Sequence, residues 1–224
     1  LLKSDDKLNT KAIYAAPFFN NKAESVADGM EKSYREILNI TSLIGIEKPV
    51  FRGSETYLPD EQTPVISDSA KDLAERANSY SPENPLYVVA IGAITNVASA
   101  ILLNPKVAEN TVIVWLGGHA QHFSHTKEFN MYQDVAAARV VFGCGVPLVQ
   151  LPCMGVVSAF TLSKPELECW FKGKNKLADY LTDITIREMG ERITTGEVWS
   201  KVIWDVTAVA WLLNDKDRFM SSRL

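Results

Sequence analysis

The chain has 224 residues, 46% of them hydrophobic, which suits one domain with a substantial core. Its formal charge of −4 and its pI near 5.5 argue against a nucleic-acid binder, because such proteins usually carry a basic patch. A membrane protein is not expected either, since every apolar run falls well short of the ~20 residues that a membrane-spanning helix needs.

Strand and helix patterns alternate along the chain. Short apolar runs predict strands, and apolar residues at spacings of three and four predict helices. The predicted strands cover residues 11–18, 49–53, 86–92, 111–118 and 146–152. The predicted helices cover residues 24–44, 67–80, 94–103, 134–142, 163–171, 174–190 and 205–213.

The alternation predicts an α/β fold. Runs 86–92 and 111–118 are apolar throughout, so both strands are expected to be buried on both faces of a sheet. We therefore predict an open, mostly parallel sheet with helices on both faces. Residues 1–224 are expected to form a single α/β domain.

The cysteines give weak evidence about the cellular compartment of the protein. Cys144, Cys153 and Cys169 are odd in number, lie in apolar surroundings and match neither a zinc site nor a disulfide framework. Their pattern favours buried free thiols, and a reducing, cytoplasmic location follows from that interpretation.

Ligands in folds of this class gather at the carboxyl ends of the strands. Asn20 follows the first predicted strand, Thr95 follows the third, and the long loop 117–130 follows the fourth. If these strands are neighbours, the three loops face one crevice.

That long loop holds all three histidines of the chain, His119, His122 and His125. A spacing of three does not align three rings on a helix, since each residue turns the chain by about 100°. A zinc site also usually takes its ligands from separate rigid elements. Exposed loop histidines are the favoured interpretation; the alternatives are that one of them contacts a polar ligand and that the three form a metal site.

Two stretches offer stronger chemistry. Glu128 and Asn130 are two residues apart, so in an extended segment both would point at one ligand and could bind adjacent hydroxyls. The alternative is a surface loop with an Asn turn signal. Asp205, between an apolar run and an apolar helix, is either a helix cap or a carboxylate available to calcium. Beside it, Trp204 is either a core residue or a stacking platform for a ring.

Four stretches in this order resemble the inosine-uridine-preferring nucleoside hydrolase family: AIGAITNVASAILLNP, WLGGHA, TKEFNMYQDVAAARVVFGCGVPL and WDVTAVAWLL. The likeness runs from about Lys11 to the end of the chain. It implies a Rossmann-like core and cleavage of the N-glycosidic bond of ribonucleosides to base and ribose. It also implies a calcium ion that binds the attacking water and the ribose diol, and a homo-oligomer, either a dimer or a tetramer.

The resemblance assigns roles by position. Calcium would be bound by the backbone carbonyl of Thr95 and the carboxylate of Asp205. Ribose would be bound by Asn20 (or Asn21), Glu128, Asn130 and His122, the last standing where the family often has another asparagine. Trp204 stands where many members have a histidine that acts as acid for the leaving base, and the resemblance to purine-preferring relatives implies that it stacks on that base instead.

The sequence departs from the family in two ways that matter. The Asp-rich N-terminal motif, which supplies most calcium carboxylates and the general base, is absent. The chain therefore resembles a family member that lacks its first strand and helix. It is expected to be truncated at both ends and to be inactive by itself. Second, Trp204 cannot donate a proton, and losing general-acid help typically costs about 10²–10⁴ in rate. There are two alternatives to a nucleoside hydrolase: a non-catalytic sugar-binding relative, and an enzyme that cleaves another glycoside.

Overall fold

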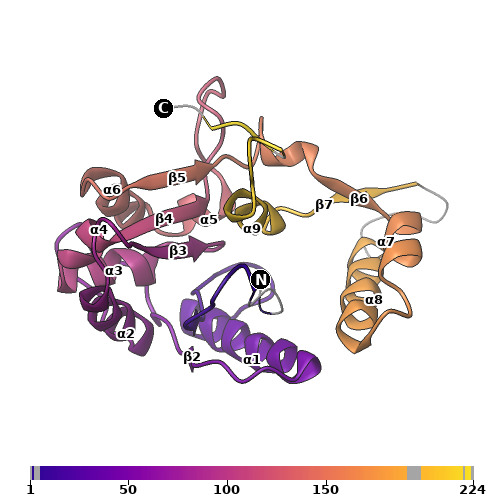
Figure 1. Ribbon diagram of the computed structural model, residues 1–224, viewed down its shortest axis with the longest axis horizontal. Helices are drawn as coiled ribbons and strands as arrows, with labels where there is room; N and C mark the ends of the chain where they lie inside the picture. The colour runs from indigo at the N-terminus through magenta and orange to yellow at the C-terminus, as the bar shows by residue number, and fades with distance from the viewer. Residues whose placement is uncertain (1, 3–5, 191–197, 219, 223–224) are drawn as a thin grey trace.

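Three parallel strands form the central sheet of the protein. The structure is a computed structural model that describes residues 2, 6–190, 198–218 and 220–222. The strands are β3 (Leu86–Ala90), β4 (Thr111–Leu116) and β5 (Leu148–Leu151), hydrogen-bonded in the order β3-β4-β5 (Figure 1). They coincide with three of the predicted apolar runs, and both pairings are parallel as predicted.

Side chains alternate between the two faces of this sheet, as the period of a strand requires. Val88, Ile113 and Trp115 belong to one apolar cluster, while Val114 and Leu116 belong to a second one. Because both faces of β4 are covered, its sequence is a continuous apolar run. The same expectation is wrong for β3, where Tyr87 is 50% exposed. In the described part of the chain β3 has a strand neighbour on one side only, so part of it faces solvent.

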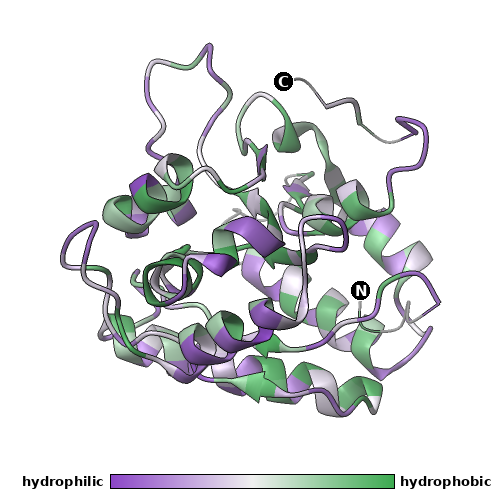
Figure 2. Cartoon of the chain, turned by 60° about the vertical axis from the view of Figure 1, so that its left-hand side comes forward, coloured by the Kyte–Doolittle hydropathy of each residue, from purple (hydrophilic) through white to green (hydrophobic). Residues whose placement is uncertain are grey.

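Helices cover both faces, which confirms the predicted fold class. The first cluster is completed by residues of α2 (Asp68–Arg76), α3 (Thr95–Leu103) and α6 (Val135–Gly143). The second is completed from α9 (Val206–Leu212), which contacts β4 from the opposite side. Figure 2 shows hydrophobic and hydrophilic residues alternating along several helices of the protein, as expected for helices with one buried face.

A second, smaller unit contains the N-terminal strands. The pair β1 (Ile13–Tyr14) and β2 (Val50–Phe51) is parallel, and α1 (Val26–Ile44) connects them. The side chain of Asn96, in α3, joins this pair to the rest of the fold: its amide donates to Ala15 O at 2.8 Å and its oxygen accepts Ser54 N at 2.8 Å. These strands are shorter than the predicted runs 11–18 and 49–53.

The C-terminal part adds a helical pair at one side of the molecule (Figure 1). It contains α7 (Lys164–Trp170) and α8 (Lys176–Gly190), flanked by the antiparallel strands β6 (Thr161–Ser163) and β7 (Ser200–Val202). α8 packs on α1, where Tyr180 donates a hydrogen bond to Glu36 at 2.8 Å and Glu188 pairs with Lys22. Both helices were predicted, but the antiparallel strand pair was not.

Two short helices were also not predicted, namely α4 (Lys106–Asn110) and α5 (Phe129–Gln133). Truncation at both ends is a prediction that concerns residues lying partly outside the described ones. Within the described residues, no helix combines the length and apolar character needed to cross a membrane.

Candidate active site

The carboxyl ends of β3, β4 and β5 open onto the same edge of the sheet because the three strands are parallel. The segments that leave this edge contain the sequence-predicted residues. Thr95 begins α3 after β3, and the loop after β4 leads through the histidines to α5.

Glu128 is the N-cap of α5, and its carboxylate is anchored by backbone N–H groups. It accepts hydrogen bonds from Gly118 at 2.9 Å, Asn130 at 2.9 Å and Met131 at 3.0 Å, and the residue is 7% exposed. A carboxylate has about four acceptor positions, so these three bonds leave one for a ligand hydroxyl. The helix start thus fixes Glu128 at the edge of the sheet.

Asn130 is fixed to the same edge by its own side chain. Its amide donates to Leu116 O, the last residue of β4, at 2.9 Å. The expected extended conformation of 128–130 is wrong, because Asn130 lies inside α5 and only Glu128 is extended. The two side chains are held by different backbone partners, and the side-chain oxygen of Asn130 and its second N–H keep their capacity to bind a hydroxyl.

Asp205 lies close enough to Glu128 for their negative charges to repel. It precedes α9 without a side-chain cap hydrogen bond, so the capping interpretation is wrong. Burial, then the charge of Glu128, raise its pKa to about 6, while Lys201 lowers it. The residue still contacts solvent. The carboxyl group is therefore accessible to a ligand.

Cys153 completes this cluster, and sequence reasoning assigned it no role. It follows β5, its N–H donates to Gly118 O at 2.9 Å, and it is 6% exposed. Burial, Glu128 and then Asp205 raise the pKa of its thiol, so it stays neutral between the two carboxylates. Its place at the carboxyl end of a strand is the signal that could have identified it.

Trp204, next to Asp205, packs against the second apolar cluster with Leu151 and Ala208. Its carbonyl accepts the hydroxyl of Thr207 at 2.6 Å. The indole is half-buried, so it combines a core contact with an accessible part. This position is compatible with stacking on a ring.

Thr95 is fully buried at the start of α3. Its hydroxyl donates to Asp134 at 2.7 Å, and Asp134 also accepts Leu58 N at 2.9 Å and Ala137 N at 2.9 Å. Asp134 therefore joins three segments at the strand ends. Its role at this site was not predicted, although an acidic residue at the start of a helix is a recognised cap signal.

Asn20 lies in an exposed turn, where its side-chain oxygen accepts Lys22 N at 2.8 Å. The turn is attached to α5, because Phe19 N donates to the side chain of Gln133 at 2.7 Å. The turn that carries Asn20 and Asn21 therefore approaches the helix that begins after Glu128, while Asn20 itself uses its oxygen locally.

His122 and His125 are exposed; the rings of His119 and His122 contact Phe123, and the ring of His125 contacts His119, each pair being tilted. His122 lies 4.6 Å from Phe123 between ring centroids. A Cβ on Gly155, whose φ is +90°, would meet the His122 ring at 3.0 Å. The histidine loop thus packs on the loop after β5.

The oxygen atoms at this edge are of the kind that calcium binds. Calcium takes roughly 6–8 oxygen ligands, and Asp205 with the Thr95 carbonyl supplies hard oxygens. Burial and then the charge of Glu128 raise the pKa of Asp205, and a cation beside this carboxyl group would favour its charged form. In the described ranges, no three His, Cys, Asp or Glu side chains converge on one point, so these residues form only part of a shell.

A protein-family model described as inosine-uridine preferring nucleoside hydrolase matches residues 11–223 of the chain. The chain is 27% identical over 163 residues to probable uridine nucleosidase 2 of Arabidopsis thaliana, covering 71% of this chain and 50% of the relative. It is 36% identical over 147 residues to the pyrimidine-specific ribonucleoside hydrolase RihB of Escherichia coli, covering 54% of this chain and 46% of the relative. The chain thus spans about half the length of these curated relatives.

The fold is also similar to that of a solved structure. The crystal structure of the effector protein XOO4466 superposes with a TM-score of 0.68 at 16% identity, covering 90% of this chain and 71% of that chain. At this level of identity the likeness concerns the fold alone.

Proposed function

Because the chain belongs to the inosine-uridine preferring nucleoside hydrolase family, we propose that it hydrolyses the N-glycosidic bond of a ribonucleoside or a related N-ribosyl compound. The products are the base and ribose. The observation that carries the proposal is the cluster at the carboxyl edge of the sheet, where Asp205 lies within electrostatic reach of Glu128, and Glu128 and Asn130 are both buried. Both curated relatives are named for pyrimidine ribonucleosides or uridine, so uridine is the first substrate to test.

The polar residues bind and orient the sugar in this proposal. Glu128 accepts one ribose hydroxyl at its remaining position, and Asn130 binds the neighbouring hydroxyl. Their backbone anchors hold both groups in place before substrate arrives, so little reorganisation accompanies binding. Asn20 and His122 approach the sugar from the turn and from the histidine loop.

The remaining residues act on the reacting bond. Asp205 and the Thr95 carbonyl would hold calcium together with oxygen ligands from outside this set. Bound calcium would lower the pKa of a water molecule. Trp204 presents its accessible ring to the base. Water attack at the anomeric carbon breaks the C–N bond through an oxocarbenium-like state, and the base leaves with a proton. The three free cysteines support action in the cytoplasm.

The proposal is tested on the complete gene product by calorimetric calcium titration and by hydrolysis assays. We expect calcium binding, and release of uracil from uridine that stops when a chelator removes the metal. Inosine and adenosine are the comparison substrates. Tight calcium binding without turnover of any nucleoside would refute the enzymatic function.

A second candidate function is suggested by Trp204, which occupies the position of the acid histidine and cannot donate a proton. In this case the protein binds a nucleoside without cleaving it. The variant Trp204→His separates the two functions. If the protein is an enzyme that stacks the base, we expect this variant to bind nucleoside at least about 10-fold more weakly, because base–aromatic stacking contributes ~1–3 kcal/mol. Unchanged ribose binding with no hydrolysis in either form would favour the non-catalytic function.

A further inference from the structure

Gln133, the last residue of α5, connects this helix to two other segments through its side chain. Its Oε1 accepts a hydrogen bond from Phe19 N at 2.7 Å, and its Nε2 donates one to Phe19 O at 3.2 Å. The same Oε1 also accepts the hydroxyl of Tyr57. The two bonds to Phe19 are of the kind that a paired strand makes with a backbone. Gln133 thus holds the Asn turn, residues 19–23, as a neighbouring strand would.

Tyr57 is suited to this contact because its hydroxyl stays protonated. Burial, then the charge of Asp134, raise the pKa of Tyr57 to about 12. Asp134, the residue after Gln133, is itself anchored, because it accepts hydrogen bonds from the hydroxyl of Thr95 at 2.7 Å and from Leu58 N at 2.9 Å. The end of α5 is therefore a fixed support for the side chain of Gln133.

The Asn turn keeps its own internal bond and a second attachment. Asn20 Oδ1 accepts Lys22 N at 2.8 Å, so the NH₂ group of Asn20 is the part that can donate to a sugar hydroxyl. At the other end of the turn, the ammonium of Lys22 pairs with Glu188 of α8. A variant without the Gln133 side chain therefore keeps the turn, but Phe19 loses the bonds that set its distance from α5.

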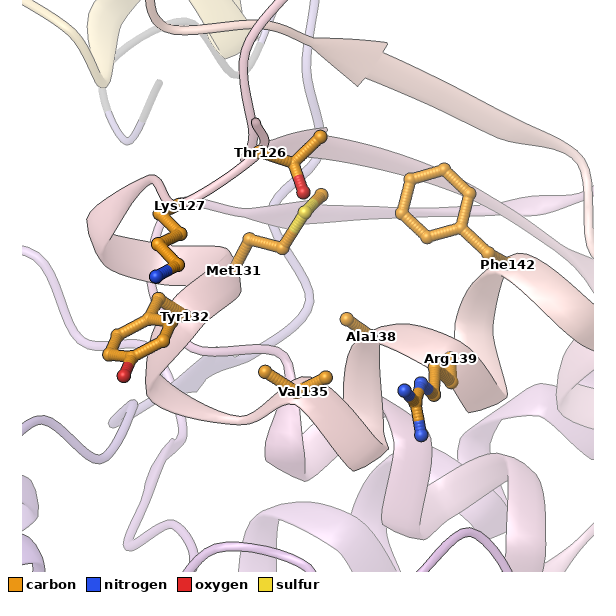
Figure 3. A pocket seen from close by; sticks show the side chains of 8 residues that line it. All are labelled: Thr126, Lys127, Met131, Tyr132, Val135, Ala138, Arg139 and Phe142. Atoms are coloured by element: carbon orange, nitrogen blue, oxygen red, sulfur yellow. The ribbon is translucent and has the colours of Figure 1, made fainter. Parts of the chain in front are cut away.

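The residues of α5 point in different directions. Met131 and Tyr132 line a groove of about 430 Å³ beside α6 (Figure 3), whereas the side chain of Gln133 is directed to the Asn turn. The start of the same helix carries Glu128 and Asn130, the proposed sugar ligands. One end of this five-residue helix thus belongs to the proposed sugar site, and its other end holds the turn that contains a third proposed ligand.

We propose that Gln133, supported by Tyr57, is a positioning residue of the sugar site. It holds the Asn turn at the distance from α5 that lets Asn20 reach the same ribose as Glu128 and Asn130. Gln133 does not contact the sugar and acts through Asn20. Its effect is preorganisation: the turn is ordered before ribose arrives, so binding does not have to order it. This inference rests on the proposed function.

Amide hydrogen exchange of the complete gene product, without calcium or sugar, tests whether Gln133 holds the turn. Gln133→Met removes all three hydrogen bonds and nearly preserves the side-chain volume. We expect exchange at Phe19 to become at least about 10-fold faster, because its N–H loses its acceptor. Gln62→Met is the matched control, since the side chain of Gln62 is exposed in the loop that also contains Tyr57. Unchanged exchange at Phe19 in Gln133→Met would overturn the proposal.

Calorimetry with ribose in the presence of calcium tests the positioning role. We expect Gln133→Met to bind ribose at least about 10-fold more weakly than the native protein and Gln62→Met to bind it equally well. Gln133→Glu should recover part of the affinity, because its carboxylate still accepts Phe19 N and the hydroxyl of Tyr57 but cannot donate to Phe19 O.

The outcomes separate this inference from the proposed function. If the native protein and Gln133→Met bind ribose equally well, even with different melting temperatures, the hydrogen bonds of Gln133 serve only the fold and the positioning role is overturned. A native protein that binds no ribose would refute the proposed function and this inference with it. The exchange rate at Phe19 would still show whether Gln133 holds the turn.

Discussion

Asp205→Asn is expected to abolish turnover and yet to stabilise the metal-free protein at neutral pH. The carboxylate would be a direct calcium ligand in the proposed site. Removal of groups that merely support metal ligands already costs about 10–100-fold in metal affinity, so we expect a loss of more than about 100-fold here. Hydrolysis should fall with calcium binding.

The stabilising effect follows from the direction of the pKa shift. The pKa of Asp205 rises from 3.8 to about 6 in the folded protein, so between these values the folded state binds more protons than the unfolded state. Stability then falls as the pH rises through this window, and the cost is fully present above pH 6. Asparagine carries no charge and escapes this cost. The variant should gain stability relative to the native protein from pH 4 to pH 7.

Denaturant unfolding in the presence of a chelator, at intervals between about pH 4 and pH 8, measures this gain. Asp215→Asn is the control, because Asp215 is also exposed and lies beyond α9, away from Glu128. A difference between Asp205→Asn and the native protein that does not change with pH would contradict the proposed repulsion between Asp205 and Glu128. Calcium titration of the same variant tests the metal ligand separately.

Glu128→Gln is expected to destabilise the protein by roughly 2 kcal/mol or more, and to weaken ribose binding. One carboxylate oxygen accepts Asn130 N, and the other accepts both Gly118 N and Met131 N. Glutamine replaces one oxygen with an NH₂ group, which then faces at least one buried N–H donor. The start of α5 loses part of its cap, while the side chain of Asn130 keeps its hydrogen bond to Leu116 O.

Thermal and denaturant unfolding measure the loss, and calorimetry with ribose measures the weakened binding. Glu109→Gln is the matched control, since Glu109 lies exposed in the first turn of the short helix α4. We expect that control to change stability by less than about 0.5 kcal/mol. An unchanged stability of Glu128→Gln would show that its backbone anchors contribute nothing to the fold.

The repeated local patterns in the chain allowed its general architecture to be predicted. The 19-residue helix α1 has enough turns for its apolar spacing to be recognised, and the strand β4, buried at all but one residue, is a largely apolar run. A period repeated several times is a property of neighbouring residues, so no distant partner is needed to detect it. The order of the motifs around Thr95, Glu128 and Asp205 indicated the family in the same way.

The tertiary structure alone decided what those site residues contact. The five-residue helix α5 is too short for a period to be recognised, and its start depends on a carboxylate that caps it and also binds Gly118, ten residues earlier. Cys153 comes next to Glu128 and Asp205 because separate strands and helices end at one edge of the sheet. The charge repulsion between Asp205 and Glu128 likewise depends on the distance between distant segments, which packing determines and local pattern does not.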